Sequence, residues 1–483
     1  MGRKRRTHGS RVGRKVVVAA SAPAPTSAPT PAPGPAEPPQ PPDVQAPVPS
    51  GRLPGFLRGA IGLLLFLGIS VPFSAATRAD GVDYVQFWLI GQEMPFGYYG
   101  KFAGEQKYAR LGGAAVEEQG GEKIAAAVAS RSRFEMTATP LFYTLCGLAV
   151  TGDYERDLRL FQFANLLAFL AGTYGLMRLW GYPRSWALLV LALVGLFYWP
   201  LRWDISTSNT NGLLLGGVAA YAWLARRRSR WAVVGSGAWL AFLTAVKPMT
   251  LLALPILLVL RCASRSWRRL ASEAIGAAAG LLIAFLSPLA IGAPLRLWRD
   301  FFQEQYRYVA QGLYGHRGLG NTSCVRALSK ALGLSQFELW ALLGGLLAAG
   351  IAALLFAYRS RSRSQDEDLF DGDLALALGL ALFLALSPLA WSHYFLLSLP
   401  LGLLLLRPDL RASRWRAWIA CFALCMLAIH PISQFREALL ETFDVSWSVL
   451  LGIQLQGGNA VLLTLGALLF VARLTGRGQV VRA

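Results

Sequence analysis

The sequence predicts an all-α protein that crosses a membrane many times. Hydrophobic residues make up 54% of its 483 residues and charged residues only 15%, which is too apolar for one soluble domain of ordinary composition. Apolar runs of about 17–25 residues, the length that spans a hydrocarbon core, recur along the chain. The net charge of +20 comes largely from Lys and Arg in the N-terminal tail and in short loops. This placement indicates topology and not a nucleic-acid partner.

The first 54 residues form a tail that cannot build a core. Residues 1–16 are basic, and Pro and Ala dominate residues 19–54. Such a composition predicts disorder with some polyproline character, and the basic end could contact anionic membrane lipids. We therefore expect a cytoplasmic tail over 1–54, a transmembrane domain over 55–474 and a short basic tail over 475–483.

The first apolar run, residues 56–76, is expected to be a retained span, because it lies too deep in the chain for a cleaved signal peptide. A long polar segment follows, residues 77–136. The next apolar piece, 139–151, has about 12 residues and is short for a span. We expect this piece to form a re-entrant or interfacial helix in the first outer loop.

Further apolar runs follow to the C-terminus and bring the predicted total to about twelve spans. They cover residues 158–178, 186–200, 208–225, 231–247, 249–261, 272–292, 337–357, 373–390, 394–407, 415–430 and 448–472. Arg clusters stand at alternate ends of these runs, and the positive-inside rule puts them in the cytoplasm with both termini. Two cytoplasmic termini require an even number of spans, and the count is even only if residues 139–151 do not cross the membrane. We expect a multi-pass protein of the plasma membrane.

This topology gathers the informative polar residues on the outer side. They are Asp80, Asp83, Asp204, Asn209, Asn211, Lys247, His316, Asn321 and His393. Nucleotide donors are scarce outside the cell, so chemistry there favours an activated donor carried by the membrane. The chain has no P-loop and no GxGxxG turn that opens a helix, and its five Cys form no CxxC pair. We expect no metal and no other cofactor.

A set of short motifs follows the chain in a fixed order. They are Asp83 with Phe87, Trp88 and Gly91, then Thr137-Ala-Thr-Pro-Leu-Phe142, Ser208-Asn-Thr-Asn-Gly-Leu213, Gly235 through Lys247-Pro248, Asn321-Thr-Ser323 and Ser387-Pro-Leu-Ala-Trp-Ser-His393. Over about residues 56–472 this set resembles glycosyltransferase family 87 of the GT-C superfamily, the polyprenyl-phosphate-mannose-dependent mannosyltransferases. The second motif lacks the family's tyrosine and the third its Gly-Gln, which leaves donor and acceptor identity open.

The resemblance implies a GT-C helical bundle that moves a hexose, mannose in this family, from a polyprenyl-phosphate sugar to a glycolipid or glycan acceptor. Such a transfer needs a base for the acceptor hydroxyl, and Asp83 suits that role. One carboxylate acting by direct displacement gives inversion. Lys247 and His393 suit the donor phosphate. Lys247 could instead only snorkel, and His393 could be a merely hydrogen-bonded residue at a span end.

Other residues are candidates for substrate contact. Asp80 could share a helical face with Asp83 and raise its pKa, or be a solvated cap. The remaining candidates are Phe87, Trp88, Arg202, Asn209, Asn211, Asn321 and Trp391. For the asparagines a helix-cap role is the alternative.

Two other classes of protein stay open at this stage. A lipid or solute transporter would show intramembrane charges in both halves and a repeated topology, and the sequence shows neither. A non-catalytic scaffold of an envelope assembly would leave the motif set without a use.

Overall fold

All regular elements that the structure describes are helices. A computed structural model describes residues 54–93, 105–131, 134, 138–227, 229–310, 322–335, 338–339, 341–345, 365–387, 390–410, 414–428 and 447–474, and none of these residues forms a strand. Those from Pro54 onward belong to one compact unit. Residues 1–53 of the predicted tail at 1–54, the predicted tail at 475–483 and most of the run at 337–357 lie outside the described residues.

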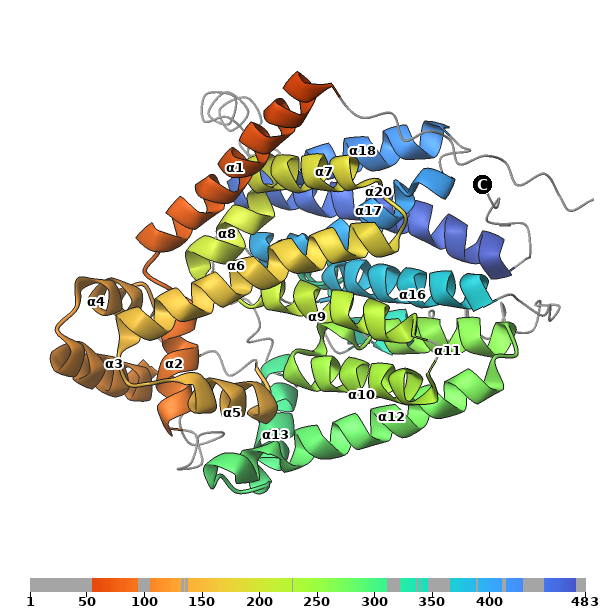
Figure 1. The fold of residues 1–483 in the computed structure, drawn as a ribbon. Helices are drawn as coiled ribbons and strands as arrows, with labels where there is room; N and C mark the ends of the chain where they lie inside the picture. The colour runs from red at the N-terminus through yellow and green to blue at the C-terminus, as the bar shows by residue number, and fades with distance from the viewer. Residues whose placement is uncertain are drawn as a thin grey trace, which may run out of the picture. The chain divides into compact units, whose positions relative to one another are not determined.

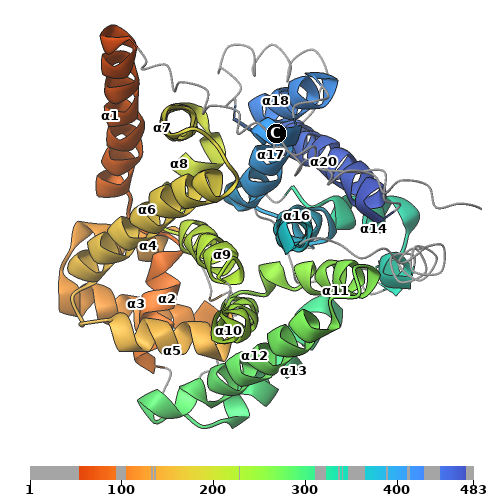
Figure 2. The same cartoon turned by 45° about the vertical axis from the view of Figure 1, so that its right-hand side comes forward.

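The first half of the unit carries the long helices around the site (Figures 1 and 2). Its elements are α1 Gly55–Arg78, α2 Tyr84–Glu93, α3 Glu105–Gln119, α4 Glu122–Ala129, α5 Pro140–Ala149, α6 Tyr154–Leu179, α7 Arg184–Phe197, α8 Trp199–Thr207, α9 Asn211–Ala225, α10 Arg230–Val246, η2 Pro248–Thr250, α11 Ala253–Ala263, α12 Trp267–Leu286 and η3 Ser287–Ile291. Both views show α9 lying beside α6 and α10 beside α12.

The second half contacts the first mainly where α16 meets α11 and α9 and where η4 meets α8 and α9. Its described elements are α13 Arg296–Ala310, α14 Cys324–Leu332, α16 Gln365–Leu386, η4 Ser392–Ser398, α17 Leu399–Leu405, η5 Pro408–Leu410, α18 Arg414–Ala428 and α20 Trp447–Leu474. α16 contacts α11, α9 and α20, so it joins the two halves. One large apolar core runs through these helices and includes Phe169, Leu260, Leu380 and Phe395.

Five of the described helical stretches are long and apolar enough to cross a membrane. They are Gly55–Arg78, Tyr154–Leu179, Trp267–Ile291, Leu369–Leu386 and Leu450–Leu474. Two bent helix pairs, α7 with α8 and α10 with α11, raise the number to seven if each pair is one span. Several of these helices expose large apolar side chains such as Phe66, Leu167 and Ile283. The protein is therefore membrane-embedded.

The expected total of about twelve spans is not confirmed. The predicted runs at 208–225 and 249–261 became α9 with 15 residues and α11 with 11. At 1.5 Å per residue, 15 residues reach only about 22 Å, short of a hydrocarbon core of about 30 Å. The 139–151 piece forms the 10-residue helix α5, which is also too short to span. Its re-entrant course stays a prediction.

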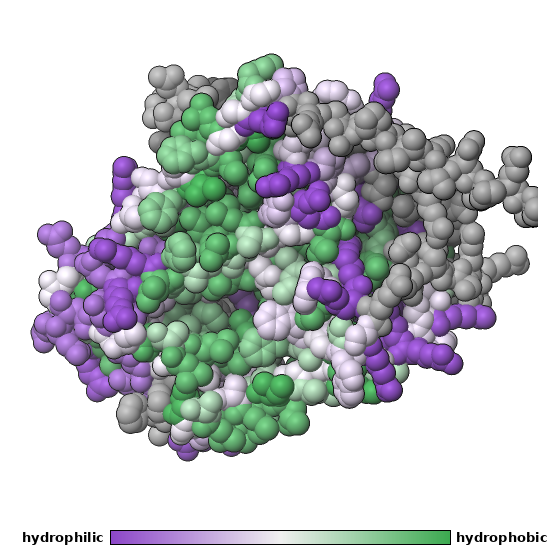
Figure 3. Space-filling model, viewed as in Figure 1, coloured by the Kyte–Doolittle hydropathy of each residue, from purple (hydrophilic) through white to green (hydrophobic). Residues whose placement is uncertain are grey.

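Hydrophilic and hydrophobic side chains separate along the face shown in Figure 3. Hydrophobic side chains cover its middle, and hydrophilic ones gather over α3 and α4 at one end and again at the opposite end. At the end away from α3 and α4, buried ion pairs tie the ends of α9, α11, α12, α16 and α20 together. These pairs are Arg226–Asp373 at 2.5 Å, Arg261–Glu273 at 3.0 Å and Arg473–Asp371 at 3.0 Å. Arg residues from several predicted cytoplasmic clusters thus share one end of the bundle.

Glycines set the spacing of α10 and α12. A Cβ on Gly237 would lie 2.0 Å from the carbonyl oxygen of Glu273, and one on Gly276 only 1.9 Å from that of Val234. No side chain fits at either position, so the two backbones touch directly. This contact fixes the course of α10, whose C-terminal end carries Lys247.

Gly237→Ala is expected to destabilise the protein by about 1–3 kcal/mol or more, because the added methyl forces the two helices apart. Gly235→Ala is the matched control on the same helix, since no atom lies within 4 Å of the position its Cβ would take. That control should be neutral or stabilising by up to about 1 kcal/mol, as helix propensity favours alanine. Thermal unfolding in detergent measures both, and equal loss in the two variants would contradict the close contact.

Candidate active site

The site is built around the turn that separates α8 from α9. Ser208 ends α8 in the left-handed conformation, with φ of 55°. The backbone N–H of Asn209 donates to the carbonyl of Asp204 at 2.9 Å, and α9 then begins at Asn211. The turn therefore presents three consecutive polar side chains, Asn209, Thr210 and Asn211, from one rigid piece of backbone.

A fully buried carboxylate, Asp204, holds this turn in place. Its Oδ1 accepts from Asn211 Nδ2 at 2.7 Å, and its Oδ2 accepts from Asn165 Nδ2 at 3.0 Å and from the N–H of Gly212 at 3.3 Å. Asn165 Oδ1 in turn accepts from the N–H of Leu213 at 2.8 Å. These bonds fasten α6 to both sides of the turn and satisfy the buried polar groups.

Lys247 reaches the turn from the end of α10. The helix ends just before it, because a residue that precedes a proline is disfavoured in the helical region, and Lys247 is extended with φ of −147°. Its Nζ donates to Asn209 Oδ1 at 2.8 Å, Asn211 Oδ1 at 3.0 Å and Thr210 Oγ1 at 3.2 Å. No described carboxylate forms an ion pair with Lys247 within 4.0 Å. All three groups that accept hydrogen bonds from its ammonium are therefore neutral.

Thr139 fixes the other side of that helix end. Its side chain caps α5 by accepting from the N–H of Phe142 at 3.2 Å. Its hydroxyl also lies 2.5 Å from the carbonyl oxygen of Ala245 and 3.2 Å from that of Val246. The Thr-Pro motif at the start of α5 therefore positions the residue that follows α10, which is Lys247.

Asp83 stands in the turn just before α2. Its backbone N–H donates to the carbonyl of Thr207 at 2.9 Å, so the turn is tied to the end of α8. Its Oδ1 accepts from Arg131 Nη1 at 2.8 Å, and its Oδ2 accepts from Asn209 Nδ2 at 2.8 Å. The side chain of Asp83 keeps 18% of its surface exposed. It is thus both held and accessible.

Electrostatics keep this carboxylate ionised. Burial by itself raises the pKa of Asp83. The guanidinium of Arg131 lowers the pKa, and the hydrogen bond from Asn209 and the charge of Lys247 add to that effect. The net result is a pKa below the ordinary value for aspartate, so Asp83 carries its charge at neutral pH.

The expectation that Asp80 shares a helical face with Asp83 and raises its pKa is wrong. α2 begins at Tyr84, so both acids precede it, and the pKa of Asp83 is lowered. Asp80 contributes its backbone carbonyl, which accepts from the hydroxyl of Tyr154 at 2.6 Å. This contact places Asp80 beside α6 and not at the polar turn.

His393 completes the polar cluster from η4. Its Nε2 lies 3.1 Å from Asn209 Nδ2 and 3.9 Å from Asp83 Oδ2. The amide of Asn209 is oriented by Lys247 and the N–H of Thr210, which both donate to its Oδ1. Its Nδ2 can therefore only donate, and His393 Nε2 accepts. The ring is then neutral with its proton on Nδ1, a buried atom for which the described residues offer no partner.

The aromatic pair and the glycine of the first motif anchor α2. Trp88 is 1% exposed and donates from Nε1 to Asp157 at 3.0 Å. Phe87 is buried and packs edge-on against the ring of Phe142. A Cβ on Gly91 would lie 3.0 Å from the backbone nitrogen of Gly147, so α2 and α5 approach closely there. These residues therefore pack α2 against α5 and α6.

Two other predicted site residues, Arg202 and Trp391, make their contacts outside the cluster. Arg202 donates to the carbonyl of Leu196, and Trp391 packs against the large core at the start of η4. Asn321 lies outside the described residues. Its neighbour Thr322 donates from both N–H and hydroxyl to the carbonyl of Ala390, at 2.8 and 2.7 Å. Residues 322–323 of the Asn-x-Ser motif therefore lie beside residues 387–390, which lead into the Trp-x-His sequence.

The structure also adds two residues that no motif indicated, since Arg131 pairs with Asp83 and Asn165 bonds Asp204. Thr210, which lies inside the motif at 208–213 but was not a candidate site residue, bonds Lys247. Arg131 follows α4 in a polar segment with many charges, where nothing in the sequence marks it. Asn165 lies inside a predicted apolar run, and a buried amide in such a run is the signal that could have found it.

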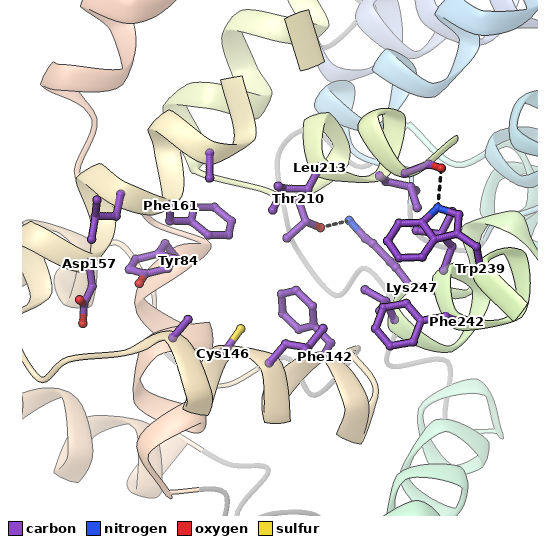
Figure 4. A pocket seen from close by; sticks show the side chains of 18 residues that line it. Tyr84, Phe142, Cys146, Asp157, Phe161, Thr210, Leu213, Trp239, Phe242 and Lys247 are labelled. Carbon is purple, nitrogen blue, oxygen red and sulfur yellow. Dashed lines mark hydrogen bonds between the residues drawn. The ribbon is translucent and has the colours of Figure 1, made fainter. Parts of the chain in front are cut away.

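An apolar cavity of about 500 Å³ opens beside Lys247 (Figure 4). Helices α5, α6, α9 and α10 line it, largely with apolar side chains that include Phe142, Phe161 and Trp239. Lys247 and Thr210 point toward one another at its wall. The ammonium-bearing Lys247 of the polar cluster therefore also lines an apolar cavity.

Fold and site define a membrane-embedded helical protein with a cation-bearing polar cluster beside an apolar cavity. The model of glycosyltransferase family 87 matches residues 136–388, more than half of the chain. The chain belongs to this family and is a glycosyltransferase. Asn209, Asn211 and Lys247 lie within the matched residues, whereas Asp83 and His393 lie outside them. The curated proteins and the solved structures contain no match to the chain.

Asp204→Leu is expected to destabilise the protein by at least about 3 kcal/mol, because it leaves three buried donors without an acceptor. Asp80→Leu is the control. Asp80 is half-buried, and among the described residues no side-chain hydrogen bond to its carboxylate is found, so the cost should stay near 0.5 kcal/mol. Thermal unfolding in detergent separates the two. Similar melting temperatures for Asp204→Leu and the wild type would contradict the role of Asp204.

Proposed function

We propose that this glycosyltransferase moves a hexose, specifically mannose, from a polyprenyl-phosphate sugar to a lipid-linked or glycan acceptor, with inversion. The observation that carries the proposal is the position of Lys247. Its ammonium has neutral hydrogen-bond partners, borders an apolar cavity, and is linked to the ionised Asp83 through Asn209. A phosphate that carries a long apolar chain matches both features.

The donor phosphate would lie against Lys247. A partly buried cation without a contacting carboxylate can stabilise an anion with little reorganisation, and charge grows on the phosphate as the glycosidic bond breaks. His393 would offer its Nδ1–H, the buried donor that lacks a partner among the described residues. Asn209 and Asn211 would contact the phosphate or the sugar hydroxyls beside it.

Asp83 would act as the general base. The acceptor oxygen attacks the anomeric carbon, the bond from that carbon to the phosphate oxygen breaks, and Asp83 takes the acceptor proton. A retaining reaction through an enzyme nucleophile needs a second carboxylate about 5 Å away. Asp204 is fully buried, and both its oxygens accept hydrogen bonds, so it is not available. One accessible carboxylate supports inversion.

The cavity beside Lys247 would receive the first isoprene units of the donor. Its lining from α5, α6, α9 and α10 is mainly apolar, and burying a hydrocarbon chain there gains about 25 cal/mol per Å² of apolar surface. The anomeric carbon then faces the polar turn, where Asp83 and His393 lie.

We propose that the site faces outside and that both termini are cytoplasmic. Tags at residues 30, 228, 362 and 480 should then report cytoplasm, and tags near 110 and 310 should report the outside, because the Arg clusters mark the cytoplasmic side. Compartment-specific labelling in intact cells measures this. An outside signal at 228 would reverse the topology and the side of the site.

Asp83→Asn is expected to reduce sugar transfer by about 100- to 10,000-fold, since asparagine keeps the volume but cannot accept the proton. The measurement is transfer of radiolabelled mannose from polyprenyl-phosphate mannose in membranes at matched expression. Asp80→Asn is the control and should retain most activity, because its carboxylate is not in the cluster. Full activity of Asp83→Asn would exclude Asp83 as the general base and would contradict this mechanism.

A further inference from the structure

Exposed arginines gather where α9 and α11 end and α10 and α12 begin, at the end of the bundle away from α3 and α4 (Figure 1). Four of them are called the basic surface here: Arg227, Arg230, Arg265 and Arg268. No carboxylate whose side chain the structure describes forms an ion pair with any of the four. Glu273 and Asp373, two acids at this end, are buried and already paired with other arginines, so they do not neutralise the basic surface.

The basic surface lies at the level where the bundle leaves the membrane. The stretch Trp267–Ile291 is long and apolar enough to cross a membrane, and it begins between Arg265 and Arg268. Trp267 is 56% exposed there, and Trp231 at the start of α10 is 81% exposed. Exposed indole rings beside arginines at the end of a span are typical of the membrane–water interface. The four guanidinium groups therefore face the lipid headgroups.

Three of the four arginines occupy positions that disfavour them within the protein itself. Arg265 has a φ of 53°, a left-handed conformation that is strained for any ordinary residue other than glycine. Arg230 and Arg268 lie in the first turns of α10 and α12, where the helix dipole disfavours a cation, and neither turn contains an acid. A partner that supplies negative charge would offset these costs.

We propose that the basic surface binds the headgroups of anionic phospholipids in the membrane leaflet on that side. Guanidinium groups form charge-assisted hydrogen bonds with phosphate, and the attractions of several basic residues near an anionic membrane surface add together. This binding is separate from the use of a sugar donor. It braces the start of α10 and of α12, two helices whose backbones touch at Gly237 and Gly276, so it supports the helix that carries Lys247 at its opposite end.

Thermal unfolding of the full chain in detergent micelles that contain either phosphatidylglycerol or phosphatidylcholine tests this binding. A ligand that binds only the folded protein raises the unfolding temperature by mass action. Phosphatidylglycerol should raise it more than phosphatidylcholine does, and added salt should reduce the difference, because it screens exposed charges. Titration of phosphatidylglycerol gives the affinity, and Arg265→Gln should weaken it about fivefold, the effect of one basic residue near an anionic surface.

Arg265 also permits a test that separates binding from folding. Arg265→Gly should unfold at the wild-type temperature or above it in phosphatidylcholine, because glycine adopts the left-handed conformation without strain. Its affinity for phosphatidylglycerol should nevertheless fall as much as that of Arg265→Gln. Arg265→Lys keeps the charge and should retain most of the affinity. Equal affinity of all three variants and the wild type would overturn the role of Arg265.

Arg156→Gln is the matched control. Arg156 is also exposed, but it lies at the start of α6 beside α3, at the opposite end of the bundle. Its removal should leave the affinity for phosphatidylglycerol unchanged. The basic N-terminal tail is the same in every variant, so differences between variants report the basic surface.

Three results would overturn the proposal. Equal protection by phosphatidylglycerol and phosphatidylcholine would show that the lipid charge is not recognised. An equal loss of affinity in Arg156→Gln and Arg265→Gln would show a general effect of net charge. Equal protection by inorganic phosphate would show a site for a free anion and not for a lipid headgroup.

Discussion

The need to satisfy one buried carboxylate, Asp204, determines the arrangement of the whole site. A charge without exposed surface is tolerated only if hydrogen bonds replace its water, and three donors from α6 and the α8–α9 turn provide them. These donors can meet only if the chain breaks between the two helices. The break produces the turn that carries Asn209, Thr210 and Asn211. Asp204 therefore positions the polar side chains of the site, although it does not itself line the cavity.

The turn then connects groups of opposite charge that do not touch. Asn209 donates to Asp83 and accepts from Lys247, which separates the proposed base from the proposed phosphate cation by one amide. A direct ion pair would neutralise both groups and leave neither for the reaction. A neutral bridge leaves Lys247 and Asp83 without a direct contact to each other, in positions that the surrounding hydrogen bonds already set. Such preorganisation is what a transfer between a lipid phosphate and a hydroxyl requires.

The sequence predicted the positions of long helices well, because a span leaves a continuous apolar run, as for 158–178 and the observed Tyr154–Leu179. It did not predict lengths near breaks such as α9, where buried polar residues interrupt the pattern. Asp83, Asn209, Lys247 and His393 were found through motifs, and the structure brings them together. Arg131 was missed because its contact with Asp83 is non-local. Phe87 and Trp88 were predicted as substrate contacts, and the structure shows them buried in packing, so their contact with substrate stays a prediction. Apolar periodicity cannot distinguish these two uses of an aromatic residue.

A structure with a bound polyprenyl-phosphate sugar, or an analogue that cannot be cleaved, tests the central claim most directly. The account predicts a phosphate oxygen about 2.8 Å from Nζ of Lys247, the isoprenoid chain in the cavity lined by α5, α6, α9 and α10, and the anomeric carbon toward Asp83. A phosphate bound away from Lys247, or a sugar with its anomeric carbon turned away from Asp83, would contradict it.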